Sequence, residues 1–450
     1  MQTSILAKYG EARLPRYTSY PTAPRFSAAV DGEAYANWLG SLPSSDAVSL
    51  YLHIPFCRSM CWYCGCHTTI TRQDEPILDY LSVLREEIRM VAARVPDRLP
   101  VREVHFGGGT PTIISPAEFL ALTALMREHF AFSYMTGIAV EIDPRGLTAE
   151  MALALGAAGV SRASLGVQSF DPVVQKAINR IQSEKQTAEA ADRLRGAGVG
   201  GINFDLIYGL PHQTVRSCID TASAAVAMRP DRLAVFGYAH IPTFKKHQRL
   251  IDETALPDAT ARNEQARAIA ETLVAAGYRQ IGLDHFALPE DELARAQEAG
   301  RLRRNFQGYT TDNCDTLIGF GASAIGRMRK GYVQNETAPG LYARRIASGR
   351  VATTKGYSLT REDKVRAEII ERLMCDFSAD IQAICQARDF DESRLLADNS
   401  KLDELERDGI VEVENGVIRV AQDHRFVIRA VAAAFDAYIE QSNRTHSQAA

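Results

Sequence analysis

The sequence has no long apolar run and no strong excess of charge of either sign. None of its apolar stretches approaches the roughly 18 residues that a membrane-spanning helix requires. The N-terminal segment MQTSILAKYGEARLPRY lacks the basic, then apolar, then small-residue order of a secretory signal. The formal net charge of −4 gives no indication of a nucleic-acid or membrane partner. We therefore expect a cytoplasmic protein.

Internal repeats and low-complexity tracts are also missing. Hydrophobic residues make up 46% and charged residues 24% of the 450 residues, which is ordinary for a globular protein. A chain of this length exceeds one typical core, so we expect one large domain and one smaller domain. The sequence carries no signal for self-association, and a monomer is the default expectation.

Cysteine is scarce except at one point. The chain has eight cysteines, and four of them fall within CRSMCWYCGC, as Cys57, Cys61, Cys64 and Cys66. In a reducing compartment, clustered cysteines bind metal or take part in chemistry more often than they form disulfides. We interpret the remaining four as small apolar residues of the interior: Cys218, Cys314, Cys375 and Cys385.

The spacing C-x3-C-x2-C-x-C favours an iron–sulfur cluster over zinc. Structural zinc sites usually pair two C-x2-C knuckles across a longer stretch and close a tetrahedron, which four crowded cysteines reach poorly. Three cysteines on one loop can instead hold three irons of a [4Fe–4S] cube and leave the fourth iron open. An open metal position is typical of a reactive site.

Strand-like and helix-like segments alternate from about residue 48 to residue 284. Apolar runs at 49–54, 103–106, 137–143, 161–167, 202–211 and 232–238 are each followed by a segment with helical spacing. The expected helices cover 77–95, 116–130, 148–158, 184–196, 214–227 and 258–276. Repeated βα units predict an α/β fold with a parallel sheet, as an open sheet or as a full or partial barrel. In the first helix we expect Leu78, Leu81, Leu84 and Ile88 to share the buried face.

The segments outside this alternation suggest four parts. We predict an N-terminal arm or lid at 1–45, the α/β unit at 46–290, connecting loops that complete the site at 291–357, and a smaller, mostly helical domain at 358–450. Within the third part, RRNFQGYTT and GFGASAIG are loop-like and rich in glycine. The fourth part contains DGIVEVENGVIRV, which predicts a β-hairpin that turns at Glu-Asn-Gly.

The motifs that carry polar or glycine residues all follow predicted strands. The cysteine loop, GGGTP, EIDPR, GVQSF and DLIYGLP stand at these positions. Parallel strands place their carboxyl ends at one edge of the sheet, where α/β barrels carry their functional residues. The three glycines of GGGTP allow the backbone to approach a ligand closely, and Glu141 of EIDPR is suited to ribose hydroxyls.

The C-x3-C-x2-C spacing resembles the signature of the radical S-adenosylmethionine superfamily. This resemblance implies a partial (βα)6 barrel and a [4Fe–4S] cluster held by Cys57, Cys61 and Cys64. It also implies that S-adenosylmethionine binds the open iron and yields a 5′-deoxyadenosyl radical. Tyr63 matches an aromatic position near the adenine. Cys66 is left without an iron, and we take it as a candidate catalytic residue that contacts substrate or a second cofactor, or as a thiol beside the cluster.

A collinear set of motifs over nearly the whole chain is similar to the oxygen-independent coproporphyrinogen III oxidases. The set comprises RYTSYPTAPRF, YLHIPFC, HFGGGTPT, EIDPR, LGVQSFD, INFDLIYGLP, YAHIP and RNFQGYTT. The resemblance implies that two propionates of coproporphyrinogen III lose CO2 and become vinyl groups, which gives protoporphyrinogen IX for heme biosynthesis. It also implies a small electron donor, a flavoprotein or a ferredoxin.

The family is further described as holding two S-adenosylmethionine molecules. Transferred by motif, the first would contact Tyr51, Gly108, Glu141 and Ile325. The second would contact Tyr63, Gly109, Thr110, Gln168, Arg180, Asp205 and Ala239. Four propionates also require cations, and the candidates for substrate binding are Arg16, Tyr20, Arg145 and Arg304. We further expect the arm with Arg16 and Tyr20 to fold over the bound tetrapyrrole.

Three other functions are weighed against this one. A related heme-binding chaperone typically has Phe in place of the fourth cysteine and lacks the SYPTA segment, whereas this chain has both Cys66 and SYPTA. A zinc-stabilised binding module would contain zinc without iron or acid-labile sulfide. A methyltransferase of the same superfamily would produce S-adenosylhomocysteine instead of 5′-deoxyadenosine.

Overall fold

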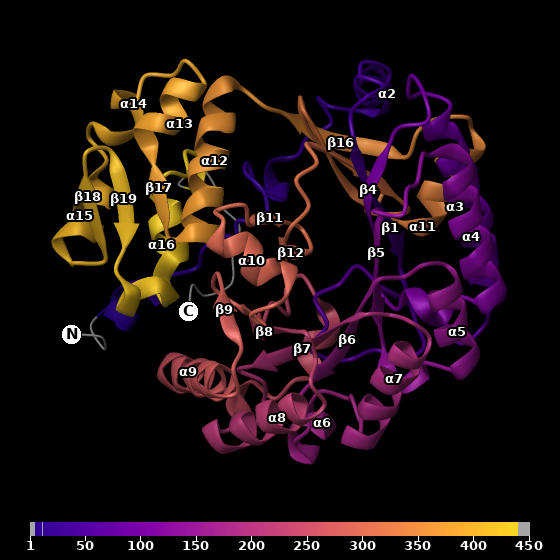
Figure 1. The fold of residues 1–450 in the computed structure, drawn as a ribbon, viewed down its shortest axis with the longest axis horizontal. Coiled ribbons are helices and arrows are strands. Elements are labelled where there is room, and N and C mark those ends of the chain that lie inside the picture. Colours follow the sequence, from indigo (N-terminus) through magenta and orange to yellow (C-terminus); the bar gives the residue numbers. More distant parts are fainter. Residues whose placement is uncertain (1–4, 11, 440–450) are drawn as a thin grey trace.

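The computed structural model describes residues 5–10 and 12–439. Figure 1 shows a row of strands that bends around the middle of the molecule, with helices on its outer side. One sheet of twelve strands runs in the order β16-β15-β14-β13-β1-β4-β5-β6-β7-β8-β10-β9. Within the described part of the chain, no helix is both long and apolar enough to cross a membrane.

Six neighbouring parallel strands form the middle of this sheet. They are β1 (Val48–Ile54), β4 (Val101–Gly108), β5 (Gly137–Ile142), β6 (Arg162–Gln168), β7 (Gly201–Tyr208) and β8 (Arg232–Gly237). The helices that follow them are α3 (Glu75–Ala92), α4 (Pro116–His129), α5 (Ala149–Ala157), α6 (Pro172–Ala177), α7 (Glu184–Gly196), α8 (Val215–Ala227) and α9 (Ala259–Ala275). The predicted α/β fold of six βα units is therefore confirmed.

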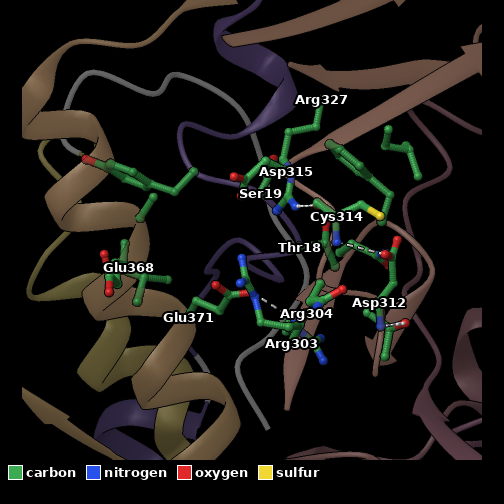
Figure 2. A pocket seen from close by; sticks show the side chains of 18 of the residues that line it. Thr18, Ser19, Arg303, Arg304, Asp312, Cys314, Asp315, Arg327, Glu368 and Glu371 are labelled. Atoms are coloured by element: carbon green, nitrogen blue, oxygen red, sulfur yellow. Dashed lines mark hydrogen bonds and ion pairs between the residues drawn. The ribbon is translucent and has the colours of Figure 1, made fainter. Parts of the chain in front are cut away.

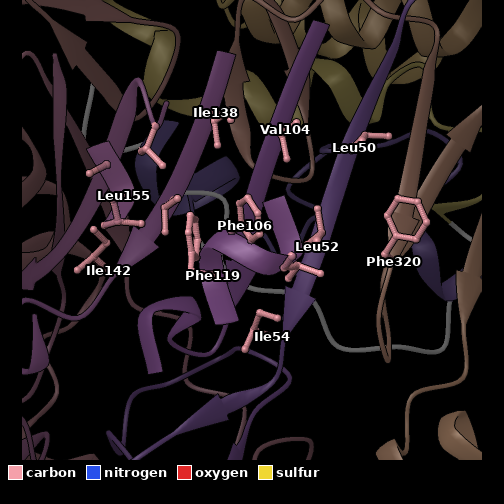
Figure 3. Close-up of a cluster of buried hydrophobic side chains, with 14 of the residues drawn as sticks. Leu50, Leu52, Ile54, Val104, Phe106, Phe119, Ile138, Ile142, Leu155 and Phe320 are labelled. Atoms are coloured by element: carbon pink, nitrogen blue, oxygen red, sulfur yellow. The ribbon is translucent and has the colours of Figure 1, made fainter. Parts of the chain in front are cut away.

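The main core lies between the parallel strands and the helices outside them. Figure 3 shows apolar side chains of β1, β4 and β5 against helices α4 and α5, with Phe106 and Phe119 in contact at a ring separation of 4.8 Å. In α3, Leu81, Leu84 and Ile88 are buried as expected. Leu78 is 49% exposed, so its expected place on the buried face is wrong. At 100° per residue it points well away from the stripe through Leu81, Leu84 and Ile88.

Shorter strands extend the sheet at both ends. One end carries β13 (Thr316–Phe320), parallel to β1, followed by the antiparallel strands β14 (Ile325–Met328), β15 (Gly331–Asn335) and β16 (Thr353–Ser358). The other end carries β10 (His285–Ala287) and β9 (Arg279–Ile281), near helix α10 (Glu292–Glu298). A separate hairpin joins β11 (Arg303–Asn305) to β12 (Gly308–Thr310).

The expectation that RRNFQGYTT forms a loop is therefore wrong, and that for GFGASAIG is confirmed only for its middle part, residues 321–324. The first segment forms the hairpin β11–β12, and the second spans the end of β13 and the start of β14. Strands of three to five residues with internal glycine show almost no alternation of apolar and polar residues. Their extended backbone is stabilised by pairing with neighbouring strands, which the local sequence does not reveal.

The C-terminal part has its own core of helices and a small sheet. Its elements are α12 (Arg361–Asp376), β17 (Ser378–Asp380), α13 (Ile381–Ala387), α14 (Ser393–Leu396), α15 (Ser400–Arg407), β18 (Val411–Glu414), β19 (Val417–Val420) and α16 (Ile428–Ala433). The predicted hairpin is confirmed as β18–β19, with Asn415 and Gly416 at positive φ in the turn. The third strand, β17, was not expected; it pairs with β19.

The N-terminal arm packs against both cores. Leu14, Tyr17 and Tyr20 are buried in the C-terminal core, while helix α2 (Gly32–Gly40) buries Tyr35 in the main core. Deletion of the arm would therefore uncover apolar surface of the C-terminal part as well as any ligand beneath it. Its role in substrate binding is better tested by single substitutions than by truncation.

A buried carboxylate ties helix α3 to the strands beyond β13. Glu87 is 2% exposed and accepts hydrogen bonds from the Gly321 N–H at 2.6 Å, from the Asn335 amide at 2.7 Å and from the Tyr342 hydroxyl of α11 (Pro339–Ala347) at 2.8 Å. Burial raises the pKa of Glu87 to about 7, despite these three donors. The folded protein therefore holds a proton there that the unfolded chain loses near pH 4.5.

This raised pKa predicts a loss of stability as the pH rises from about 4.5 to about 7. We expect the free energy of unfolding of the wild-type protein to fall by about 3 kcal/mol relative to Glu87→Gln across pH 4.5 to 7. Denaturant unfolding at several pH values measures this difference. A constant difference between the two proteins across the range would contradict the prediction.

Candidate functional site

The cysteine loop begins directly after β1, at the carboxyl edge of the parallel strands. It is bounded by β2 (Phe56–Cys57) and β3 (Thr69–Ile70), which pair with each other in parallel. Cys57 ends β2, Cys61 is buried, and Cys66 is exposed. The loop therefore presents its thiols at the edge where the other predicted motifs end.

Segments from two other parts of the barrel hold this loop in place. The Trp62 N–H donates to the Ile178 carbonyl at 2.9 Å, and the side chain of Asn179 donates to the Met60 carbonyl at 2.8 Å. After β8, Gln248 donates to the carbonyl of Tyr63 at 3.0 Å and to that of Ala239 at 3.2 Å. The backbone of the loop is therefore held by hydrogen bonds on both sides.

The four thiols have different surroundings. The Cys57 sulfur lies 3.2 Å from the Thr110 hydroxyl, and the Cys61 sulfur lies 3.5 Å from the Arg180 guanidinium. Burial, together with the neighbouring Cys64 and Cys61, raises the pKa of Cys57 to about 11, although the Thr110 hydroxyl lowers it. The Cys66 thiol and backbone N–H donate to the Cys64 sulfur and lower the pKa of Cys64.

No group of three or more His, Cys, Asp or Glu side chains within residues 5–10 and 12–439 is arranged to hold a single metal ion. A [4Fe–4S] cube makes a different demand, because each cysteine binds a separate iron. Three thiols of one loop around a shared space suit such a cube.

The glycines of the GGGTP segment lie close to one backbone and to several side chains. A Cβ at Gly109 would lie 2.5 Å from the Phe56 carbonyl oxygen, and one at Gly107 would lie 2.8 Å from Glu141 Oε1. Gly108 has φ of +115° and faces the imidazole of His53. A side chain at Gly109 would push the strand end away from the cysteine loop, and one at Gly107 or Gly108 would displace Glu141 or His53.

Glu141 is fixed as an acceptor at the end of β5. Its two carboxylate oxygens accept from His105 Nε2 at 3.0 Å and from the Gly108 N–H at 3.1 Å. Burial alone would raise the pKa of Glu141, but His105 and the Gly108 N–H outweigh it and hold this pKa below its ordinary value. Each carboxylate oxygen has a second lone pair that remains available for a hydroxyl donor.

Arg180 is buried beside the cluster loop. It is 5% exposed, donates to the Gly166 carbonyl at 2.6 Å, and lies 3.4 Å from Asp143, which also pairs with Arg145. Its Nε atom is buried and has no hydrogen-bond partner among the described residues. This orphaned donor suits the carboxylate of a bound molecule.

The other predicted cofactor residues stand along the same edge. Tyr51 lies within β1, where its hydroxyl is 2.9 Å from His53 Nδ1; Gln168 ends β6 with φ of +68°. Asp205 of β7 accepts from Ser164 and Asn203, and burial raises its pKa to about 6. Ala239 follows β8, and Ile325 begins β14.

The four predicted substrate residues do not form one group. Arg16 and Arg304 are in contact, with the Arg304 guanidinium 3.5 Å from the Arg16 carbonyl. Arg145 lies elsewhere, paired with Asp143 at 2.6 Å beside Cys61. Tyr20 is buried in the C-terminal core, where its hydroxyl accepts from the Ala437 N–H. Their roles toward substrate stay predictions.

Comparison with known proteins shows which family this chain belongs to. Residues 51–225 match the family model of the radical SAM superfamily. A protein of Bradyrhizobium diazoefficiens named oxygen-independent coproporphyrinogen III oxidase is 57% identical over 449 residues, with 100% of both chains covered. The chain belongs to the oxygen-independent coproporphyrinogen III oxidases. The Escherichia coli protein of the same name is 38% identical, with 98% of this chain and 96% of that protein covered.

A solved structure of the Escherichia coli coproporphyrinogen III oxidase, described as a radical SAM enzyme, agrees with this membership. It aligns with a TM-score of 0.90 at 37% identity and covers 95% of this chain and 100% of its own. The chain is thus a radical SAM enzyme, and its family implies a [4Fe–4S] cluster and S-adenosylmethionine. The three thiols, the anionic Glu141 and the unpartnered Nε of Arg180 fit those two groups.

Sequence reasoning missed three residues that shape this site. His105 pairs with Glu141, Asp143 joins Arg145 to Arg180, and Gln248 ties the cysteine loop to the segment after β8. The sequence could have pointed to Asp143, because this residue follows Glu141 by two positions in the EIDPR motif. Gln248 had none, since its contact joins residues far apart in the chain.

Proposed function

We propose that this protein converts coproporphyrinogen III into protoporphyrinogen IX without oxygen. Each of two propionates would lose a hydrogen atom, one electron and CO2, and would become a vinyl group. The observation that carries the proposal is the convergence of the cysteine loop, the GGGTP backbone and Glu141 at one sheet edge, in a chain 57% identical to a named oxidase over its whole length. A small flavoprotein or ferredoxin would supply electrons, and the protein would act as a monomer.

We infer that Cys57, Cys61 and Cys64 hold the cluster and that two S-adenosylmethionine molecules bind beside it. The first would lie against Tyr51, Gly108, Glu141 and Ile325, and the second against Tyr63, Gly109, Thr110, Gln168, Arg180, Asp205 and Ala239. When bound, the cluster and S-adenosylmethionine supply a radical that can remove a hydrogen atom from an unactivated carbon. Such a bond is too strong for a side-chain base.

The residues of the chain would position and orient the bound groups. Glu141 stays charged, because His105 and the Gly108 N–H lower its pKa, and can accept from ribose hydroxyls. Arg180 directs a charge toward the space beside Cys61 and can pair with a carboxylate. The glycines at 107–109 keep the strand end close to the cysteine loop, so that a ligand is held between the two.

An anaerobic assay tests the proposed function. Cluster-reconstituted protein is mixed with S-adenosylmethionine, a one-electron reductant and coproporphyrinogen III, and the porphyrins and adenosyl products are separated by chromatography. We expect protoporphyrinogen IX and about two molecules of 5′-deoxyadenosine per product. Cleavage of S-adenosylmethionine without vinyl product would contradict the proposal, and a heme titration would follow. S-adenosylhomocysteine would indicate a methyltransferase instead.

A further inference from the structure

A cavity, which we call the arginine cavity, lies beyond the carboxyl ends of β7 and β8, between the barrel and the C-terminal part. Its volume is about 560 Å³, which is in the range of small-molecule sites. Six arginines but only three acidic side chains line it. The arginines come from four segments that are far apart in the chain: Arg16 of the arm, Arg262 and Arg267 of α9, Arg304 of β11, and Arg425 and Arg429 near the C-terminus.

Two of these guanidinium groups are buried. Arg304 is 8% exposed and lies over the Tyr309 ring at 4.4 Å; its Nε atom is buried with no hydrogen-bond partner among the described residues. Arg429 is 6% exposed and donates to the carbonyls of Leu14 and Pro15. Burial, together with the nearby Arg16, lowers the pKa of Arg429 to about 9. These buried positive charges lie close together and oppose one another.

Arg262 is the least compensated of the group. Its guanidinium lies 5.7 Å from the Tyr208 ring centre and has no carboxylate partner among the described residues. A Cβ at Gly209 would lie within contact distance of Arg262 Nη1, and one at Gly237 would lie 3.1 Å from Nη2. Glycine at the two strand ends therefore makes room for this side chain inside the cavity.

One carboxylate inside the cavity, that of Asp284, interacts with several cations. Asp284 lies 3.8 Å from Arg304 and 2.8 Å from His285. Burial would raise the pKa of Asp284, but Arg304, His285 and Arg16 outweigh it and lower this pKa to about 2. With six arginines against three acidic side chains among the described residues that line it, the cavity is positive.

The larger cavity on the other side of the β11–β12 hairpin differs in this respect. Figure 2 shows that space, about 880 Å³, with Arg303 directed toward Glu371 and Arg327 toward the Cys314 backbone. There Arg303 pairs with Glu371 at 3.0 Å and Arg372 with Asp376 at 2.5 Å. Arg303 and Arg372 thus have carboxylate partners, whereas Arg262 of the arginine cavity has none among the described residues.

The arginine cavity also has apolar walls and lies next to the cofactor site. Tyr208, Phe236, Phe377 and Phe426 line it, so a ligand with a hydrophobic body and carboxylates at its edge would match both features. Tyr238 belongs to its wall, and the following residue, Ala239, shares the Gln248 amide with Tyr63 of the cysteine loop. A macrocycle seated here would reach toward the loop.

We propose that this arginine cavity, through Arg16, Arg262, Arg304 and Arg429, binds the propionate carboxylates that are not reacting. The inference rests on the proposed function and names where its substrate is anchored. Each guanidinium can form a bidentate pair with a carboxylate. The anchored propionates, on rings C and D, keep their carboxylates through both steps, so the same anchor serves each decarboxylation.

Equilibrium binding of porphyrins to the cluster-containing protein tests this inference by fluorescence. The probes are coproporphyrin III with four propionates, mesoporphyrin IX with propionates on rings C and D only, and etioporphyrin III with none. We expect Arg262→Met to weaken the binding of coproporphyrin III and of mesoporphyrin IX by the same factor, about tenfold or more, because one charge-assisted pair is lost in each case. Binding of etioporphyrin III should not change. Arg262→Lys should restore part of the affinity.

The matched control is Arg216→Met, which removes an exposed arginine of α8 that pairs with Asp220. It should bind all three probes as the wild-type protein does. The iron and acid-labile sulfide content of Arg262→Met should equal that of the wild type, which shows that the cluster site is intact.

Two results would overturn the inference. Unchanged affinity of Arg262→Met for coproporphyrin III would exclude the cavity as the anchor, and weakening confined to coproporphyrin III would place the reacting propionates there instead. The proposed function fails separately, if the wild-type protein makes no vinyl product. Carboxylate-dependent porphyrin binding through Arg262 would still stand in that case.

Discussion

Replacing Cys61 by alanine should remove the iron–sulfur cluster, whereas replacing Cys66 should leave it in place. Cys61 is buried between Arg145 and Arg180, where a thiolate bound to iron would be stabilised by two positive charges. Cys66 is exposed, and alanine keeps its backbone N–H bond to the Cys64 sulfur while it removes the bond from the thiol. We expect Cys61→Ala to lose product formation by at least about a thousandfold, because the proposed radical forms at the cluster that this variant lacks.

Iron and acid-labile sulfide analysis after anaerobic reconstitution measures this difference. About four irons per chain should remain in Cys66→Ala and almost none in Cys61→Ala. If Cys66→Ala also lost its iron, Cys66 would be needed to hold the cluster, and the assignment of Cys57, Cys61 and Cys64 as its ligands would fail. If Cys66→Ala kept the cluster but lost turnover, Cys66 would act on substrate or cofactor, as we predict from the sequence.

The parallel part of the fold was predictable from local sequence, for a physical reason. Strands buried on both faces form short continuous apolar runs, and the helices between them have a single apolar face, so both patterns are visible in the chain. Helix α7 occupies Glu184–Gly196, the range expected from its spacing. Its first residue follows Ser183, whose side chain accepts from the Gln186 N–H and marks the start of the helix.

The elements beyond β10 were not predictable in the same way. Strand β13 joins β1, which lies more than 250 residues earlier in the chain, with Tyr51 opposite Gly319. Such a pairing depends on the shape of the whole sheet rather than on local preference. The same holds for the arm, because Tyr17 and Tyr20 are buried by residues near the other end of the chain.

The candidate site was predictable where a motif follows a strand, and not where two distant segments meet. The positions of Gly108, Glu141 and Asp205 follow from the rule that parallel strands end at one edge. The arginine cavity follows no such rule, since Arg16, Arg262 and Arg429 come from the arm, from α9 and from the C-terminal part. Each arginine alone resembles an ordinary surface residue in the sequence.

Arg180→Met should reduce the number of bound S-adenosylmethionine molecules from two to one. The Arg180 guanidinium is buried, and its Nε has no partner among the described residues, so a ligand carboxylate would complete its hydrogen bonds. Loss of a bidentate, charge-assisted pair should weaken the binding of the second S-adenosylmethionine molecule by at least about a hundredfold. Equilibrium dialysis with labelled S-adenosylmethionine counts the bound molecules, and iron analysis confirms that the cluster is present.

Asp143→Asn separates ligand binding from local structure. Arg180 also lies 3.4 Å from Asp143, so its removal disturbs that carboxylate and the Arg145 pair beside it. Asp143→Asn disturbs the same contacts but keeps the Arg180 guanidinium, and should therefore still bind two molecules. One bound molecule in both variants would mean that Arg180 acts by holding the strand end. Two bound molecules in Arg180→Met would show that its guanidinium does not bind the second S-adenosylmethionine.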